Sequence, residues 1–124
     1  MNNKDRNVLT LAYIGDGIYE LLVRNYLVLK GNYKVNDLQK MAIKYVSAKA
    51  QCEILKKIME ANILNEIEIS IVLRARNNTN GRHPKNTDIV TYKHATALEA
   101  LFGYLYLEKD YDRINLLLNY VIGE

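Results

Sequence analysis

The sequence predicts an all-α fold, and three observations support this prediction. Apolar residues recur every three or four positions over nearly the whole chain, which is the spacing of an amphipathic helix. The chain has a single proline, Pro84, so little interrupts the helical pattern. Its 124 residues, of which 49% are hydrophobic, suffice for one buried core. We therefore expect one domain, residues 1–124, of six or seven helices.

The first half of the chain is expected to hold two or three helices. A first helix should run from about Asp5 to Leu29, and the lysine, glycine and asparagine at 30–32 are a typical helix stop. Asn36 can cap the next helix and Ser47 a further one, because such side chains accept hydrogen bonds from free backbone N–H groups. The pattern leaves open whether these last two are one continuous helix.

A helix and a long loop are expected to follow. Asn65 should cap a helix through Leu73, with Glu66 and Glu68 near the positive end of the helix dipole. The polar residues from Asn77 to Asn86 predict a loop.

Two helices are expected to close the fold. Thr87 or Asp88 can cap a helix that ends near Leu107, and Asp110 can cap the last one. The last helix carries an apolar face, so it should pack against the rest of the domain.

The composition excludes several classes of protein. Cys52 is the only cysteine, so neither an intrachain disulfide nor a cysteine-based zinc site is possible. Charged residues interrupt the apolar runs before they reach membrane-spanning length. The polar N-terminal residues, 1–7, lack the apolar core of a signal peptide. We therefore expect a cytoplasmic protein.

Basic residues are concentrated in one polar segment, residues 74–93. It carries five basic residues and one acid, an excess of four positive charges, so the rest of the chain sums to one negative charge. Cations grouped in this way can follow a phosphate backbone, although an ordinary solvated loop is the alternative. The candidate RNA-binding residues are Arg74, Arg76, Arg82, His83, Lys85, Asn86 and Lys93.

Two acids lie inside strongly apolar helical runs, Asp16 in the first part of the chain and Glu99 about eighty residues later. A carboxylate in such a place costs free energy unless something compensates its charge. Mg²⁺ typically takes one or two carboxylates together with waters and substrate phosphate. Glu20 lies one helical turn beyond Asp16 and can point the same way. With the basic segment, the two acids indicate a metal-dependent enzyme that acts on nucleic acid.

Each acid also has a purely structural interpretation. Gly15 and Gly17 weaken the helix around Asp16, which could therefore cap a helix break, although Tyr19 stands where a capping box needs Glu or Gln. The same glycines could instead let another backbone or a ligand approach closely. Glu99 could be a surface glutamate on a narrow polar face.

Together these motifs resemble the ribonuclease III catalytic domain, in particular its small bacterial branch, Mini-ribonuclease III. The run from Leu11 to Glu20 is similar to the first family motif, which contains Leu-Gly-Asp-Ala-Val. The run from Thr96 to Gly103 is similar to the second, Asp-x-x-Glu-Ala-Leu-Ile-Gly. Residues 74–77, followed by 84–88 and Tyr92, resemble the Mini branch specifically. The resemblance covers nearly the whole chain.

The resemblance implies a homodimeric endoribonuclease that cleaves double-stranded RNA with Mg²⁺. Asp16 and Glu99 match the catalytic, metal-binding acids, and the apolar face around Tyr13, Ile14 and Leu21 would pack against the partner subunit. The implied substrate is the large-subunit (23S) ribosomal RNA precursor, and an assisting large-subunit ribosomal protein is left open. No double-stranded-RNA-binding domain is expected, so the catalytic domain should make all RNA contacts.

Two carboxylates of the larger relatives are missing, since their positions hold Ala12 and Thr96. Two acids and several waters can still hold one Mg²⁺, whereas a second metal and a metal contact from Glu20 are left open. Thr96 could orient a coordinated water. The alternative is a catalytically silent, dimeric RNA-binding or ribosome-assembly module of the same fold. Retention of both Asp16 and Glu99 favours the enzyme.

Overall fold

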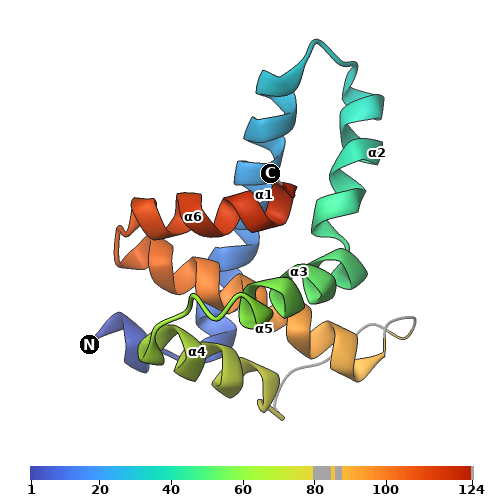
Figure 1. Cartoon of the computed structure of the whole chain (residues 1–124). Helices are drawn as coiled ribbons and strands as arrows, with labels where there is room; N and C mark the ends of the chain where they lie inside the picture. The colour runs from blue at the N-terminus through green and yellow to red at the C-terminus, as the bar shows by residue number, and fades with distance from the viewer. Residues whose placement is uncertain (80–84, 86–87, 124) are drawn as a thin grey trace.

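Six α-helices and one short 3-10 helix form the described part of the chain, residues 1–79, 85 and 88–123 of the computed structural model. In chain order they are η1 (Asn3–Asp5), α1 (Val8–Lys30), α2 (Val35–Val46), α3 (Ala48–Glu60), α4 (Glu66–Arg76), α5 (Ile89–Leu107) and α6 (Tyr111–Ile122) (Figure 1). The prediction of an all-α fold is confirmed. None of the described helices is both long and apolar enough to cross a membrane.

Helix α1 begins at Val8 and not near Asp5, because the side chain of Asn7 caps it by accepting a hydrogen bond from the N–H of Leu9. The residues before Asn7 form the separate 3-10 helix. The helix then continues without a break through Asp16 to Lys30. Asp16 is therefore not a helix cap, and the interpretation of this region as a helix break is wrong.

Ser47 separates α2 from α3, which answers the question that the sequence pattern leaves open. Its backbone ends α2, and its side chain accepts a hydrogen bond from the N–H of Ala50 in the first turn of α3. Helix α2 starts at Val35 without a side-chain cap, so the predicted cap, Asn36, lies inside the helix.

The later helices begin where the sequence predicts. Their side-chain caps are Asn65 for α4, Asp88 for α5 and Asp110 for α6. The α4 cap is a full capping box, in which Glu68 bonds back to the backbone of the cap residue. Helix α4 continues to Arg76, beyond the predicted end at Leu73. Thr87, the other predicted cap for α5, lies outside the described residues.

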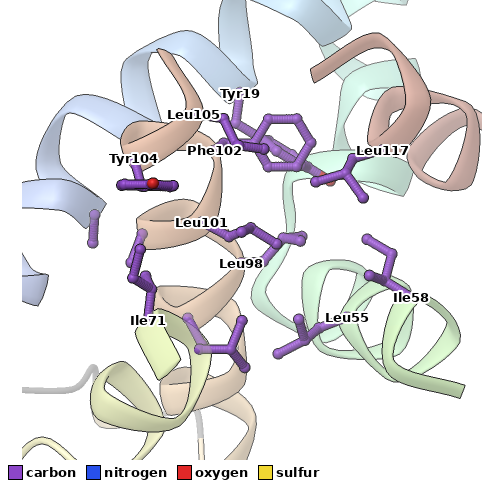
Figure 2. Close-up of a cluster of buried hydrophobic side chains, with 14 of the residues drawn as sticks. Tyr19, Leu55, Ile58, Ile71, Leu98, Leu101, Phe102, Tyr104, Leu105 and Leu117 are labelled. Carbon is purple, nitrogen blue, oxygen red and sulfur yellow. The ribbon is translucent and has the colours of Figure 1, made fainter. Parts of the chain in front are cut away.

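Helix α5 passes through the middle of the molecule, with α1, α3, α4 and α6 packed around it (Figure 1). Every residue from Ala95 to Leu105 is buried except Glu99. Figure 2 shows part of this core, in which the rings of Tyr19 and Phe102 meet edge to face at 5.3 Å between centroids. Glu99 is thus the only carboxyl group in this stretch of α5, and the only one of its residues that is not buried.

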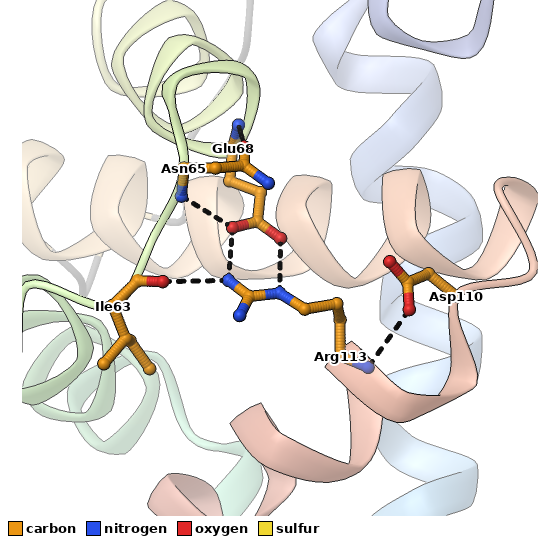
Figure 3. A network of polar contacts seen from close by, with 5 residues as sticks. All are labelled: Ile63, Asn65, Glu68, Asp110 and Arg113. Atoms are coloured by element: carbon orange, nitrogen blue, oxygen red, sulfur yellow. Dashed lines mark hydrogen bonds and ion pairs between the residues drawn. The ribbon is translucent and has the colours of Figure 1, made fainter.

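A buried ion pair joins α4 to α6. The Arg113 guanidinium donates to both carboxylate oxygens of Glu68 and to the backbone oxygen of Ile63 (Figure 3). Glu68 is only 1% exposed and also accepts a hydrogen bond from the N–H of Asn65. All of these contacts hold the fold together, so Glu68 is not a candidate site acid.

The second half of α1 and all of α2 extend from the body of the molecule as a helical hairpin, here called the arm (Figure 1). No residue of α2 is buried. The two helices enclose a largely apolar groove of about 280 Å³, lined among others by Leu27, Val28 and Leu38. The arm therefore leaves several large apolar side chains exposed, among them Leu21, Val28 and Ile43.

Candidate functional site

Two glycines bring the helices of Asp16 and Glu99 into direct backbone contact. A Cβ atom on Gly15 of α1 would lie 1.7 Å from the backbone oxygen of Glu99 on α5. A Cβ atom on Gly103 would lie 1.9 Å from the backbone oxygen of Leu11. No other residue fits at either crossing point, because real Cβ atoms never approach so closely. The crossing sets Asp16 beside Glu99, and it confirms that Gly15 allows the close approach of another backbone.

The two carboxyl groups interact strongly. The pKa of Glu99 is raised to about 8, chiefly by burial and further by Asp16, which accepts a hydrogen bond from the protonated form and carries a negative charge. Glu20 adds a smaller repulsion, whereas a hydrogen bond from Gln51 lowers the pKa of Glu99. Asp16 is the exposed member of the pair and Glu99 the partly buried one. The folded chain thus places two acids together where both cannot readily carry a charge.

This pair of acids suits a divalent cation. Within the described residues neither Asp16 nor Glu99 has a basic ion-pair partner. Carboxylate oxygens are the donors that Mg²⁺ prefers, and a cation would relieve the repulsion between them. The described residues contain no cluster of three or more His, Cys, Asp or Glu residues that could hold a metal. The chain therefore offers a donor set of two acids, with Glu20 near them.

The two positions that lack an acid are filled differently. Ala12 is 7% exposed and belongs to the hydrophobic core. Thr96 is 8% exposed and lines a very small cavity together with Leu9 and Lys93. Glu20 is partly exposed and lies 3.7 Å from Arg24, measured between carboxylate oxygen and guanidinium nitrogen. Of Ala12, Thr96 and Glu20, only Glu20 carries a carboxylate, and one of its two oxygens faces Arg24.

The predicted RNA-binding residues fall into three groups. Arg74 donates hydrogen bonds to the backbone oxygens of Lys4 at 2.6 Å and Arg6 at 2.7 Å, so it fastens the N-terminal segment to α4. The described residues without such a contact are Arg76 in the last turn of α4, Lys85 and Lys93. Arg82, His83 and Asn86 lie outside the described residues.

The sequence reasoning overlooked two features of this region. Gln51 on α3 is only 4% exposed, and its side chain hydrogen-bonds Glu99. Its signal is a polar residue on the apolar face of α3, in register with Ile54, Leu55 and Ile58. The second feature is a basic stretch, residues 30–57, with seven lysines and two acids, which is more positive than the segment 74–93.

Known proteins resemble the chain along most of its length. The family model described as the ribonuclease III domain matches residues 9–110. A protein named Mini-ribonuclease 3 from Staphylococcus aureus is 46% identical over 116 residues, which cover 94% of this chain and 87% of that protein. A Mini-ribonuclease 3 from Brevibacillus brevis is 49% identical over 108 residues, or 87% of this chain and 79% of that protein.

The fold is also similar to that of a solved structure. The crystal structure of a protein from Fusobacterium nucleatum superposes with a TM-score of 0.85 and 39% sequence identity, covering 100% of this chain and 99% of that chain. Its likeness extends over the acid pair, the arm and the last helix alike. The chain therefore belongs to the ribonuclease III family, in its Mini-ribonuclease 3 branch, and is an endoribonuclease.

Proposed function

We propose that the chain is a homodimeric, Mg²⁺-dependent endoribonuclease for double-stranded RNA, with Asp16 and Glu99 as its catalytic acids. The observation that carries this proposal is the acid pair itself, held together by the glycine crossing and without a basic partner in the described part of the chain. Mg²⁺, when bound there, supplies positive charge beside a phosphodiester and lowers the pKa of a bound water.

Asp16, Glu99 and their neighbours Glu20 and Thr96 have different surroundings, and we propose a different role for each. Glu99 is only partly exposed and lies between buried residues of α5, which fix its backbone beside Asp16. Asp16 is exposed to solvent, so RNA can approach the acid pair from the side of Asp16. Glu20 adds negative charge that attracts a cation, and the Thr96 hydroxyl is the polar group that remains where larger relatives have a carboxylate.

A second copy of the chain is proposed to cover one face of α1. Tyr13, Leu21 and Val28 are 83%, 60% and 58% exposed, and they lie on one stripe of the helix. Gly17 lies in the same stripe, and a Cβ atom there would meet nothing within 4 Å, so the surface is open to another backbone. The stripe runs directly beside Asp16, so a dimer formed on it would bring two acid pairs to one RNA duplex.

The proposed substrate is the large-subunit ribosomal RNA precursor, a cytoplasmic RNA. This proposal rests on the resemblance of residues 74–77 and 84–88 to the Mini branch, and on the basic charge of the segment 74–93. Arg76, Lys85 and Lys93, with Arg82, His83 and Asn86, are the proposed RNA contacts. Assistance by a large-subunit ribosomal protein would be tested by adding that protein to the cleavage reaction.

Cleavage of a labelled RNA duplex tests the acids. In Mg²⁺ we expect the wild type to cut, and the Asp16→Asn and Glu99→Gln variants to lose at least a thousandfold in rate while they still bind the duplex in Ca²⁺. The matched control is Glu53→Gln, which removes an exposed carboxylate of α3 and should cut like the wild type. Full activity of either acid variant would overturn the site assignment.

Two further cleavage experiments test the proposed substrate and the catalytic activity itself. A stem from the ribosomal RNA precursor should be cut faster than an unrelated duplex of equal length, and equal rates would remove the substrate proposal. Tight binding of all duplexes without any cutting would instead support the silent RNA-binding module.

A further inference from the structure

Three exposed polar residues share one face of α2, in the arm. Asn36, Lys40 and Lys44 are spaced four residues apart, so they form a stripe along the helix. Lys40 and Lys44 each lie two positions from Ala42, which lines the apolar groove between α1 and α2. Two positions correspond to about 160° around a helix, so both lysines point away from the groove. This stripe of three residues is called the lysine face.

The lysine face carries positive charge that the fold itself does not neutralise. Residues 30–46 hold four lysines and one acid, an excess of three positive charges, which equals the net charge of the whole chain. Neither Lys40 nor Lys44 belongs to an ion pair between described residues. Like charges one turn apart on a helix repel each other. An anionic partner would relieve this repulsion.

A hydrogen bond fixes where the lysine face begins relative to the acid pair. The hydroxyl of buried Tyr19 on α1 donates to the backbone oxygen of Tyr45 at 2.6 Å. Tyr45 follows Lys44 in the chain, and Tyr19 lies about one helical turn from Asp16 on α1. Measured along α1, the lysine face therefore begins about one turn from Asp16. It continues for roughly 12 Å along α2 toward the tip of the arm (Figure 1).

A phosphate backbone is the ligand that suits this face. Lys40 and Lys44 are about 6 Å apart along the axis of α2, which is close to the spacing of neighbouring phosphates in one RNA strand. Lysine ammonium groups and asparagine amides are among the groups that typically contact phosphate and sugar oxygens of nucleic acids. The same face turns away from Val28, which lines the groove and belongs to the proposed dimer stripe. It therefore stays accessible to RNA when that stripe is covered.

We propose that the lysine face is a second RNA-binding surface, which contacts phosphates of the duplex apart from those at the acid pair and the basic segment 74–93. The inference rests on the proposed function, because it needs a double-stranded RNA held at the acid pair. Lys40 and Lys44 take no part in the cleavage step, so they affect how tightly the duplex binds and not how fast bound duplex is cut. Asp37, an exposed acid in the first turn of α2, lies beside the face and opposes binding.

The test is the double variant Lys40→Gln/Lys44→Gln, in which glutamine keeps a similar helix propensity without the charge. Fluorescence anisotropy with a labelled RNA duplex in Ca²⁺, at several KCl concentrations, should give a dissociation constant about tenfold or more above that of the wild type. The salt dependence of binding should fall by about two charges. In Mg²⁺ the KM for cleavage should rise in parallel, with kcat within about twofold of the wild-type value.

Asp37→Asn is the opposite change, because it removes the acid beside the lysine face. It should bind the duplex more tightly than the wild type, a result that partial unfolding cannot imitate. If the double variant does not fold, the Asp37→Asn measurement decides, and wild-type affinity there refutes the inference.

Lys4→Gln/Lys109→Gln is the matched control. It removes the same charge from two exposed lysines at the end of the body where Asn3 bonds Glu108, and it should bind like the wild type. If both double variants weaken binding equally, net charge alone is responsible and the inference is wrong. It is equally wrong if Lys40→Gln/Lys44→Gln keeps the wild-type salt dependence, or lowers kcat and leaves KM unchanged. A wild type that binds no RNA duplex would instead refute the proposed function.

Discussion

At the level of single residues, the position of the acid pair depends on two glycines that carry no functional group. Gly15 and Gly103 let the backbones of α1 and α5 touch, and each would force a Cβ atom onto a backbone oxygen if it were replaced. A backbone oxygen in a packed helix cannot move aside as the end of a flexible side chain can. Any larger residue must therefore push the two helices, and with them Asp16 and Glu99, apart.

Gly103→Ala should consequently be both unstable and inactive. Forcing an extra carbon into a packed core costs about 1–3 kcal/mol, and more where the backbone must shift. Urea denaturation should show this loss, and cleavage should fall even below the unfolding transition. Gly17→Ala is the control, since its Cβ atom meets nothing within 4 Å and alanine gains about 1 kcal/mol in a helix. This control is compared for stability alone, at concentrations that dissociate the proposed dimer, because Gly17 lies in the proposed interface. Equal stability of both variants would contradict the crossing argument.

The raised pKa of Glu99 predicts a pH-dependent stability. Its pKa is about 8 in the folded chain against an ordinary value of 4.5, so the folded state keeps a proton that the unfolded state has lost. The free energy of unfolding should therefore fall as the pH rises from about 4.5 to about 8. Urea midpoints measured in EDTA at several pH values check this. Glu99→Gln should remove most of the dependence, and parallel curves for both proteins would show that another group causes it.

At the level of helices, local signals are the ones that the sequence predicts best. Asn65, Asp88 and Asp110 were each expected as caps, and all three accept the expected backbone hydrogen bond. A cap depends on residues within one turn, so sequence suffices for it. At the start of α2 the local signal was misleading, because the helix begins at Val35 without a side-chain cap and Asn36, the predicted cap, lies inside it. The alternative interpretation of a helix break at Asp16 is wrong, because tertiary contacts of Gly15 outweigh its low helix propensity.

In the candidate site, too, some features can be predicted from the sequence and others depend on how the helices pack. Asp16 and Glu99 stand out in sequence because a charge interrupts an apolar pattern. Their proximity, by contrast, depends on the crossing of α1 and α5. The contact of Gln51 with Glu99 depends on the packing of α3 against α5, which no spacing within one helix can reveal. The positive charge of Arg74 is visible in the sequence, whereas its hydrogen bonds to the backbone oxygens of Lys4 and Arg6 depend on the fold.

Arg74 and Arg76, two residues apart on α4, should therefore respond differently to loss of charge. Arg74→Met removes the contacts with the backbone oxygens of Lys4 and Arg6, so hydrogen exchange should increase in the N-terminal segment. Arg76→Met should leave that segment protected and weaken duplex binding, with a salt dependence lower by about one charge. Exchange and binding are measured on both proteins. The assignment is wrong if Arg76→Met loosens the N-terminus or Arg74→Met leaves it protected.

At the level of the whole molecule, α5 and its surrounding helices make a well-packed body, whereas the arm leaves apolar residues of α1 and α2 exposed. An exposed apolar stripe of this kind is typical of an interface. The stripe and one member of the acid pair, Asp16, both lie on α1. Dimer formation and cleavage are therefore expected to depend on the same helix.

Leu21→Asp should break the proposed dimer, because it places a charge in the middle of the stripe. Sedimentation velocity at micromolar concentration should show a dimer for the wild type and a monomer for this variant, with slower cleavage. Leu116→Asp changes another exposed leucine, which lies on α6 away from the stripe, and should remain a dimer. A wild type that sediments as a monomer would exclude the paired arrangement.

The glycine crossing is also the point about which α1 would tilt relative to α5. From Gly15 to Lys30 the helix extends over about 22 Å, so tilting α1 by five degrees moves the arm tip by roughly 2 Å. Asp16 is the residue next to the pivot and hardly moves. A small tilt of α1 about this point would therefore displace the tip of the arm while it changed the separation of the two carboxyl groups very little.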